Sequence, residues 1–129
     1  MFVIDAINPK AESEGIWFDF MGSKFKIAST SSSAYQKRLA KLYHPHRRKI
    51  EQGKLDPDIG NELIAKALAG SILTDWKDVS DIEGNDVAFS KEVAKTALMV
   101  NEDLREFVME SATDIDGFRQ EFKEAVVKT

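Results

Sequence analysis

The feature that most constrains the fold is an alternating apolar pattern on either side of Gly22-Ser23. A glycine at the first central position of a two-residue turn is typical of a type II′ β-hairpin. In that register Asp19 pairs with Lys26, and one face of the hairpin carries four apolar side chains, Phe18, Phe20, Phe25 and Ile27. The pattern therefore predicts a β-hairpin over 15–28. Because an isolated hairpin is only marginally stable in water, this apolar face must pack on the rest of the chain.

Residues 33–127 carry the apolar spacing and the capping residues that are typical of helices. Capping residues and N-terminal prolines indicate helix starts at the Ser/Thr run 30–33, Pro45, Asp56, Ser90, Asn101 and Thr113. The helix that starts at Asp56 has an apolar stripe that reaches Leu73, and Thr113 with Asp116 resembles a capping box. The predicted fold class is α+β, mainly α, with an N-terminal β-hairpin followed by about five helices.

The 129 residues are predicted to form a single domain over 1–129. A mobile arm is expected over 1–14, where polar residues follow a short apolar start. There is no cysteine, which excludes disulfides, cysteine-based zinc sites and cysteine nucleophiles. No apolar run approaches the roughly 20 residues that span a bilayer, and the N-terminus lacks the pattern of a signal peptide. We therefore expect no membrane partner.

Charge is distributed unevenly along the chain, although the net charge is only −4. Residues 37–54 carry a net charge of +6, whereas residues 55–129 carry a net charge of −9. Such asymmetry says more about partners than about the fold. The basic segment is suited to phosphate, and equally to the acidic half of a second copy. The second pairing would be a head-to-tail contact, which builds rings or open helices.

The sequence offers no catalytic, cofactor or metal site. Its two histidines flank Pro45 within a cationic stretch, which disfavours a divalent ion. The acidic turn at 75–86 fails as an EF-hand, because placing Gly84 at position 6 puts Val79 and Ser90 at positions that require ligands. We therefore expect no catalytic residue, no cofactor and no metal, and a protein that is not an enzyme.

Three groups of residues are candidates for partner binding. Trp17 falls on the hairpin face opposite the main apolar face, and tryptophan is enriched at binding hot spots. Small residues at Ala65, Ala69 and Gly70 would let another element approach closely. The third group consists of the cations Lys37, Arg38, Lys41, Arg47, Arg48 and Lys49.

Several segments occur in an order that has a counterpart in known proteins. They are the aromatic hairpin from Gly15-Ile16-Trp17-Phe18 to Phe25-Lys26-Ile27-Ala28, a Tyr/Leu helix with a basic tail, Leu73-Thr74-Asp75-Trp76, Gly84, and Val87-Ala88-Phe89-Ser90. This order resembles the tail assembly chaperone family of long-tailed bacteriophages. The resemblance implies a non-enzymatic protein of the bacterial host cytoplasm that binds the tape measure protein and supports tail tube assembly. It also implies a homo-oligomer, with the tail tube protein as a further partner.

Two other functions remain open at this point. A small nucleic-acid-binding regulatory protein could use the basic segment 37–54, although the acidic remainder of the chain makes nucleic acid the less favoured partner. A small enzyme or cation-binding protein could be built on the acidic turn at 75–86. Retention on heparin would support the first alternative, and stabilisation by calcium would support the second.

Overall fold

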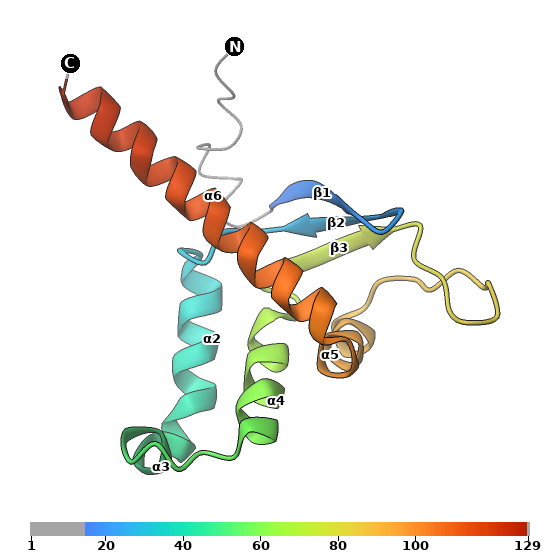
Figure 1. Ribbon diagram of the computed structural model, residues 1–129, viewed down its shortest axis with the longest axis horizontal. Helices are drawn as coiled ribbons and strands as arrows, with labels where there is room; N and C mark the ends of the chain where they lie inside the picture. The colour runs from blue at the N-terminus through green and yellow to red at the C-terminus, as the bar shows by residue number, and fades with distance from the viewer. Residues whose placement is uncertain (1–14, 129) are drawn as a thin grey trace.

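The computed structural model describes the backbone of residues 15–128 and the side chains of residues 15–115. The predicted mobile arm at 1–14 and the aromatic positions Phe118 and Phe122 of the last predicted helix lie outside the described side chains. A small antiparallel sheet is crossed by one long helix; two helices extend from one end of the sheet, and a further helix lies beside the start of the long helix (Figure 1).

The sheet has three strands in the order β1-β2-β3, namely β1 (Ile16–Phe20), β2 (Ser23–Ile27) and β3 (Leu73–Lys77). The predicted register of the hairpin is wrong, because Asp19 pairs with Lys24 and not with Lys26. The central turn residues are Met21 and Gly22, with φ angles of 51° and 83°. Two positive φ angles are the signature of a type I′ turn. Each residue of β1 therefore pairs with a residue of β2 two positions earlier than predicted. Because side chains alternate between the two faces of a strand, this shift of two leaves the apolar side chains on one face.

The predicted fold class, a β-hairpin followed by about five helices, is wrong in two respects. The first concerns the third strand, β3, which lies in a segment that was assigned to the end of a helix. Helix α4 (Pro57–Leu68) stops earlier, and Gly70 turns the chain with a φ of 86°. Leu73 fits the helical stripe of α4, but pairing with Ile27 of β2 buries it completely. Tertiary pairing therefore overrides the local helical pattern.

The second error concerns the number of helices. Within residues 15–128, four helices have ten residues or more: α2 (Ser33–Tyr43), α4, α5 (Lys91–Val100) and α6 (Glu102–Lys128). Between α2 and α4 lie only the short 3₁₀ turn η2 (His44–His46) and the single-turn helix α3 (Arg47–Glu51). No helix starts at Thr113, whose Oγ1 donates a hydrogen bond to the carbonyl of Met109 at 2.8 Å within α6. A hydroxyl can bond its own helix in this way, so the capping-box pattern did not mark a boundary.

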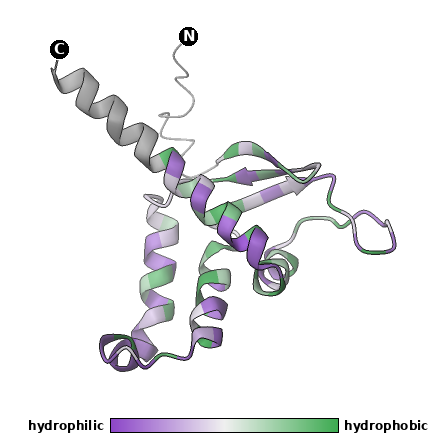
Figure 2. Cartoon of the chain, in the orientation of Figure 1, coloured by the Kyte–Doolittle hydropathy of each residue, from purple (hydrophilic) through white to green (hydrophobic). Residues whose placement is uncertain are grey.

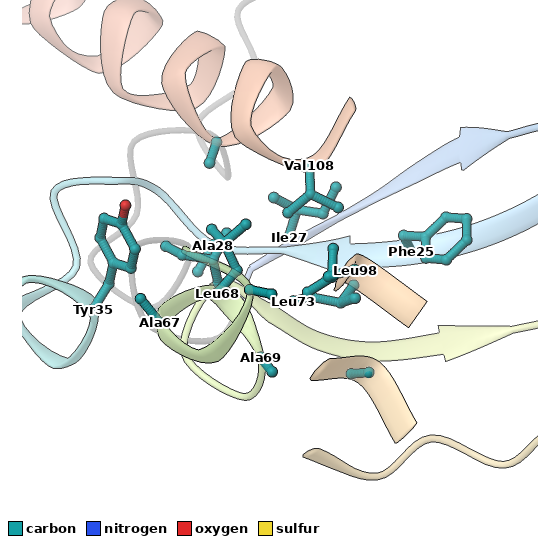
Figure 3. Packing of buried hydrophobic residues seen from close by; sticks show 14 of the residues in the cluster. Phe25, Ile27, Ala28, Tyr35, Ala67, Leu68, Ala69, Leu73, Leu98 and Val108 are labelled. Atoms are coloured by element: carbon teal, nitrogen blue, oxygen red, sulfur yellow. The ribbon is translucent and has the colours of Figure 1, made fainter. Parts of the chain in front are cut away.

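The core lies where the sheet meets α4, α5 and α6. Side chains from all four elements are fully buried there, namely Ile27, Leu68, Ile72, Leu73, Leu98 and Val108. Figure 3 shows Ile27, Leu98 and Val108 meeting between the sheet and the helices. The main burial is therefore concentrated at one end of α4, and the other end of the α2–α4 pair extends away from it (Figure 1).

A cluster of aromatic rings joins the sheet to α6. Phe107 of α6 stacks on Phe20 with ring centroids 4.3 Å apart, and contacts Phe18 and Phe25 edge-on. Phe18, Phe20 and Phe25 are three of the four residues of the predicted apolar hairpin face. On β3, Trp76 contacts Phe25 edge-on, and its Nε1 donates a hydrogen bond to the carbonyl of Val87 at 2.7 Å. Such aromatic pairs add about 0.5–1.5 kcal/mol each beyond the area that they bury.

Candidate partner-binding site

A cationic pocket lies between α2 and the turn that follows α4. It has a volume of about 320 Å³ and is lined by Ala34, Lys37, Arg38, Lys41, Gly70, Ser71 and Lys91. Four of these residues are among the predicted partner-binding residues, and Lys91 joins them from the first turn of α5. The fold therefore gathers four positive charges from two helices, which are far apart in the sequence.

Gly70 determines where the Lys91 side chain of the cationic pocket can lie. A Cβ atom on Gly70 would approach the Cγ and Cε atoms of Lys91 to 2.8 Å, well inside van der Waals contact. The missing side chain lets the apolar stem of Lys91 pass over the Gly70 backbone while the ammonium group reaches the pocket. On the opposite side, the Nε of Arg38 donates a 2.6 Å hydrogen bond to the carbonyl of Lys66. This bond orients the guanidinium group.

The lining of the cationic pocket contains no carboxylate. Among residues 15–115, whose side chains are described, the only ion pair joins Lys66 to Glu62 on α4. The terminal nitrogens of Arg38 and the ammonium groups of its neighbours thus face solvent without an acidic partner from these residues. Such a pocket is chemically suited to a carboxylate or a phosphate, because charge-assisted hydrogen bonds are the stronger ones.

Arg47, Arg48 and Lys49 lie elsewhere, on α3 at the far end of α2. A second hollow of about 290 Å³ opens beside them, which we call the α3 hollow; its lining consists of Ala40, Tyr43, His44, Arg47, Ile50 and Glu51. The Nη1 of Arg47 donates a hydrogen bond to the carbonyl of His44 at 3.0 Å. This bond holds the guanidinium at the edge of the hollow. Figure 2 shows this end of the molecule as predominantly hydrophilic.

The opposite pole of charge is the acidic loop, Ser80–Asp86, which projects from the end of β3 (Figure 1). The loop is closed by its own hydrogen bonds. Oδ1 of Asp81 accepts from the backbone N–H groups of Asn85 and Glu83, both at 2.9 Å. These bonds, the one from Asn85 first, hold the pKa of Asp81 below its ordinary value. Ile82 stands fully exposed at the tip.

The acidic turn does not assemble a metal site among the described side chains. Within residues 15–115, no group of three or more histidine, aspartate or glutamate side chains is close enough to hold an ion. The Asp81 carboxylate is directed to its own loop, as the hydrogen bonds above describe. The cation-binding alternative therefore gains no support from the arrangement of these carboxylates.

Comparison with known proteins places the chain in a family. A model of the YdaY prophage protein family matches residues 30–129. The chain belongs to this family. It is therefore a phage-related protein. No curated protein and no solved structure matches the chain. None of the helices described for this YdaY family member is long and apolar enough to cross a membrane.

Helix α5 of the YdaY family member presents an apolar face to solvent. A hollow of about 530 Å³ lies along it, lined by Glu92, Val93, Thr96, Ala97, Val100 and Asn101. Val93 is 40% exposed and Val100 is 76% exposed. With Ala97 they occupy positions i, i+4 and i+7, which lie along one side of a helix. Sequence reasoning missed this surface, because the same spacing is typical of a helix face that packs on a core.

The remaining predicted residues have contrasting positions in this YdaY family member. Trp17 is 37% exposed on the sheet face opposite α6, and the Nζ of Lys77 lies 4.5 Å from its ring centroid. Ala65 and Ala69 belong to the buried core cluster, so they do not line a groove on the surface. Of the small-residue group, only Gly70 reaches the cationic pocket.

Proposed function

We propose that this YdaY family member is a phage tail assembly chaperone. In this proposal the protein acts without catalysis, in the cytoplasm of the bacterial host. It binds the tape measure protein and supports tail tube assembly, with the tail tube protein as a further partner. Two findings support the proposal: the family is a prophage family, and three of the segments that resemble tail assembly chaperones pack together through Trp76, Phe25 and Phe89.

The observation that carries the client-binding part is the apolar face of α5. An amphipathic helix of a client can lay its own apolar side chains along Val93, Ala97 and Val100, in the manner of helix-in-groove recognition. Full burial of a valine side chain stabilises a contact by roughly 1.5–3 kcal/mol. Glu92 and Asn101, at the two ends of the hollow, would form a polar rim. We assign client binding to this face and not to the surface predicted over Ala65 and Ala69, because both of these residues are buried in the core.

Co-expression with the tape measure protein of the same prophage tests this function. We expect the wild-type chain to keep the tape measure protein soluble and to co-purify with it. The double variant Val93→Asp/Val100→Asp should lose co-purification while keeping its thermal unfolding midpoint, since both side chains are exposed. Met21→Asp is the matched control, because Met21 is an exposed apolar residue in the β1–β2 turn. A client that stays soluble with the double variant would argue against the α5 face.

The cationic pocket favours a second candidate, a nucleic-acid-binding regulatory protein. Its four cations without an acidic neighbour would suit the phosphate backbone. Fluorescence anisotropy with duplex DNA over a salt series tests this function. A binder that uses the pocket should lose affinity as salt rises, with a log–log slope of roughly −0.9 for each phosphate neutralised. The variant Lys37→Glu/Lys41→Glu should reduce that slope; absence of binding at low salt would exclude this function.

A further inference from the structure

We propose that the acidic loop of one copy docks into the α3 hollow of a second copy. Ile82 would enter the hollow as an apolar knob, and the carboxylates around it would meet the cations of α3. The inference rests on the proposed function, because the resemblance to tail assembly chaperones implies a homo-oligomer, and it names the contact between copies.

The acidic loop has the chemistry of a docking element. Ile82 is its only large apolar side chain at the tip and is fully exposed, with Asp81 and Glu83 directly beside it. The hydrogen bonds to Asp81 and the backbone pairing between Ser80 and Asp86 hold the loop in one conformation. A preformed loop loses little conformational entropy on binding, which favours association.

The α3 hollow has the complementary chemistry. Ala40, Tyr43 and Ile50 supply apolar lining, and Ile50 is 39% exposed in the isolated chain. Arg47 lines the hollow beside Glu51, and the exposed cations Lys41, Arg48 and Lys49 lie on the same elements, α3 and the end of α2, so this end of the molecule carries a net positive charge. An apolar centre with a charged rim is the usual anatomy of a protein–protein contact. The cationic pocket near Gly70 lacks such an apolar centre, so we assign the knob to the α3 hollow.

The two elements lie at opposite ends of the molecule (Figure 1). One chain therefore cannot bring its acidic loop to its own α3 hollow. A contact between different surfaces of two copies is heterologous, and it generates a ring if the rotation closes or a filament if it does not. Because one loop tip covers a small area, we expect weak association that depends on concentration. Screening should weaken it further, since the Debye length falls from about 10 Å at 0.1 M salt to about 3 Å at 1 M salt.

Two variants that each lack one half of the contact test the proposal. Ile82→Asp removes the knob but keeps the hollow, and Ile50→Asp spoils the hollow but keeps the knob. We expect wild-type protein to form a concentration-dependent series of oligomers in sedimentation velocity at low salt. Each variant alone should be monomeric under the same conditions. A mixture of the two variants should form a one-to-one dimer and nothing larger, because only one intact contact is possible.

Charge exchange gives an independent measurement of the same contact. Glu83→Lys should weaken association about tenfold, and Arg48→Glu should do the same. Mixing these two variants should restore association, because the Glu83 loop of one variant meets the intact Arg48 of the other and the two reversed charges also meet as an opposite pair. The double variant Glu83→Lys/Arg48→Glu should likewise recover a large part of the association. Recovery in the double variant would identify the residues as neighbours across the contact, and its absence would contradict that pairing.

Several outcomes would overturn the proposal. Wild-type protein that stays monomeric at all concentrations in low salt would do so, as would variants that assemble like the wild type. Val100→Asp serves as the control, because it places an acid on an exposed apolar residue of α5 and should leave self-association intact. Capture of the tape measure protein distinguishes the two proposals. Ile82→Asp should still capture the client. A loss of client capture that occurs only in the α5 variants would concern the proposed function and would leave the result on self-association unchanged.

Discussion

The sheet with α5 and α6 and the pair formed by α2 and α3 are built on different principles. Around the sheet, aromatic rings and branched aliphatic side chains from distant segments are buried together. In α2 the only buried side chain is Tyr35, whose pKa is raised first by burial and then by Tyr43. Helix α3 buries none of its side chains. The first region maintains the fold, and the second holds cations where a partner can reach them.

The largest expected difference between the regions comes from removing an aromatic side chain in each. Trp76→Ala should lower the free energy of unfolding by about 3–5 kcal/mol, because it leaves a cavity against Phe25 and Phe89. Tyr43→Ala should cost only about 1 kcal/mol, since Tyr43 lies at the partly exposed edge of the α3 hollow. Urea unfolding of both variants measures the difference. Equal losses would mean that α2 and α3 contribute to stability as much as the sheet does.

A second pair of substitutions compares two glycines with positive φ angles. At Gly15 (φ 97°) a Cβ would lie 2.7 Å from the backbone carbon of Ile27, so Gly15→Ala should cost about 2–4 kcal/mol from strain and crowding together. At Gly53 (φ 65°) a Cβ meets nothing within 4 Å, so Gly53→Ala should cost only about 1 kcal/mol of conformational strain. Thermal unfolding of the two variants checks this order. A lower unfolding midpoint for Gly53→Ala than for Gly15→Ala would contradict it.

Capping residues should contribute equally at the start of α5 and at the start of α4, because a cap acts locally. Ser90 accepts a hydrogen bond from the N–H of Val93 at the start of α5, and Asp56 accepts one from Asp58 at the start of α4. Ser90→Ala and Asp56→Ala should each lower the free energy of unfolding by about 1 kcal/mol. Chemical denaturation with both variants tests this equality. A difference well beyond that value would show that one cap also supports tertiary packing.

The smallest effect concerns the acidic loop and its pH dependence. The pKa of Asp81 is lowered in the folded loop. The loop order that the ionised Asp81 carboxylate maintains is therefore fully present above the ordinary aspartate pKa. That order is lost as the pH falls through the lowered pKa. The amide resonances of Glu83 and Asn85 should therefore titrate below the ordinary aspartate pKa. In Asp81→Asn this titration should disappear, and a midpoint at or above the ordinary value would contradict the loop geometry.

The sequence predicted features that depend on local pattern. The hairpin face of Phe18, Phe20, Phe25 and Ile27 was identified correctly, because strand alternation does not depend on the exact turn. The turn type was missed, because the pattern gave no reason to place Met21 in a left-handed conformation. Strand β3 was also missed, because it requires a partner strand from much earlier in the chain.

The binding surfaces were predicted less completely than the hairpin. The basic residues of α2 are evident in the sequence, but nothing there associates them with Lys91 on another helix. The side chain of Lys91 reaches the pocket because Gly70 lacks a side chain, and that relation exists only after α4 and α5 have packed. Conversely, the small residues Ala65 and Ala69 were read as a possible surface groove, although their size serves close packing inside the core.

The pairing of Ile27 with Leu73 has a kinetic consequence. Helices α2, α3 and α4 all lie in the loop that this pairing closes, so β2 and β3 can meet only after a long segment has been brought together. Loop closure is costly in entropy, and it is less so when the intervening segment is already compact. The contact between α2 and α4 joins neighbours in the chain and can form early. Substitutions that weaken the contact between α2 and α4 should therefore slow folding, even where they leave the unfolding rate almost unchanged.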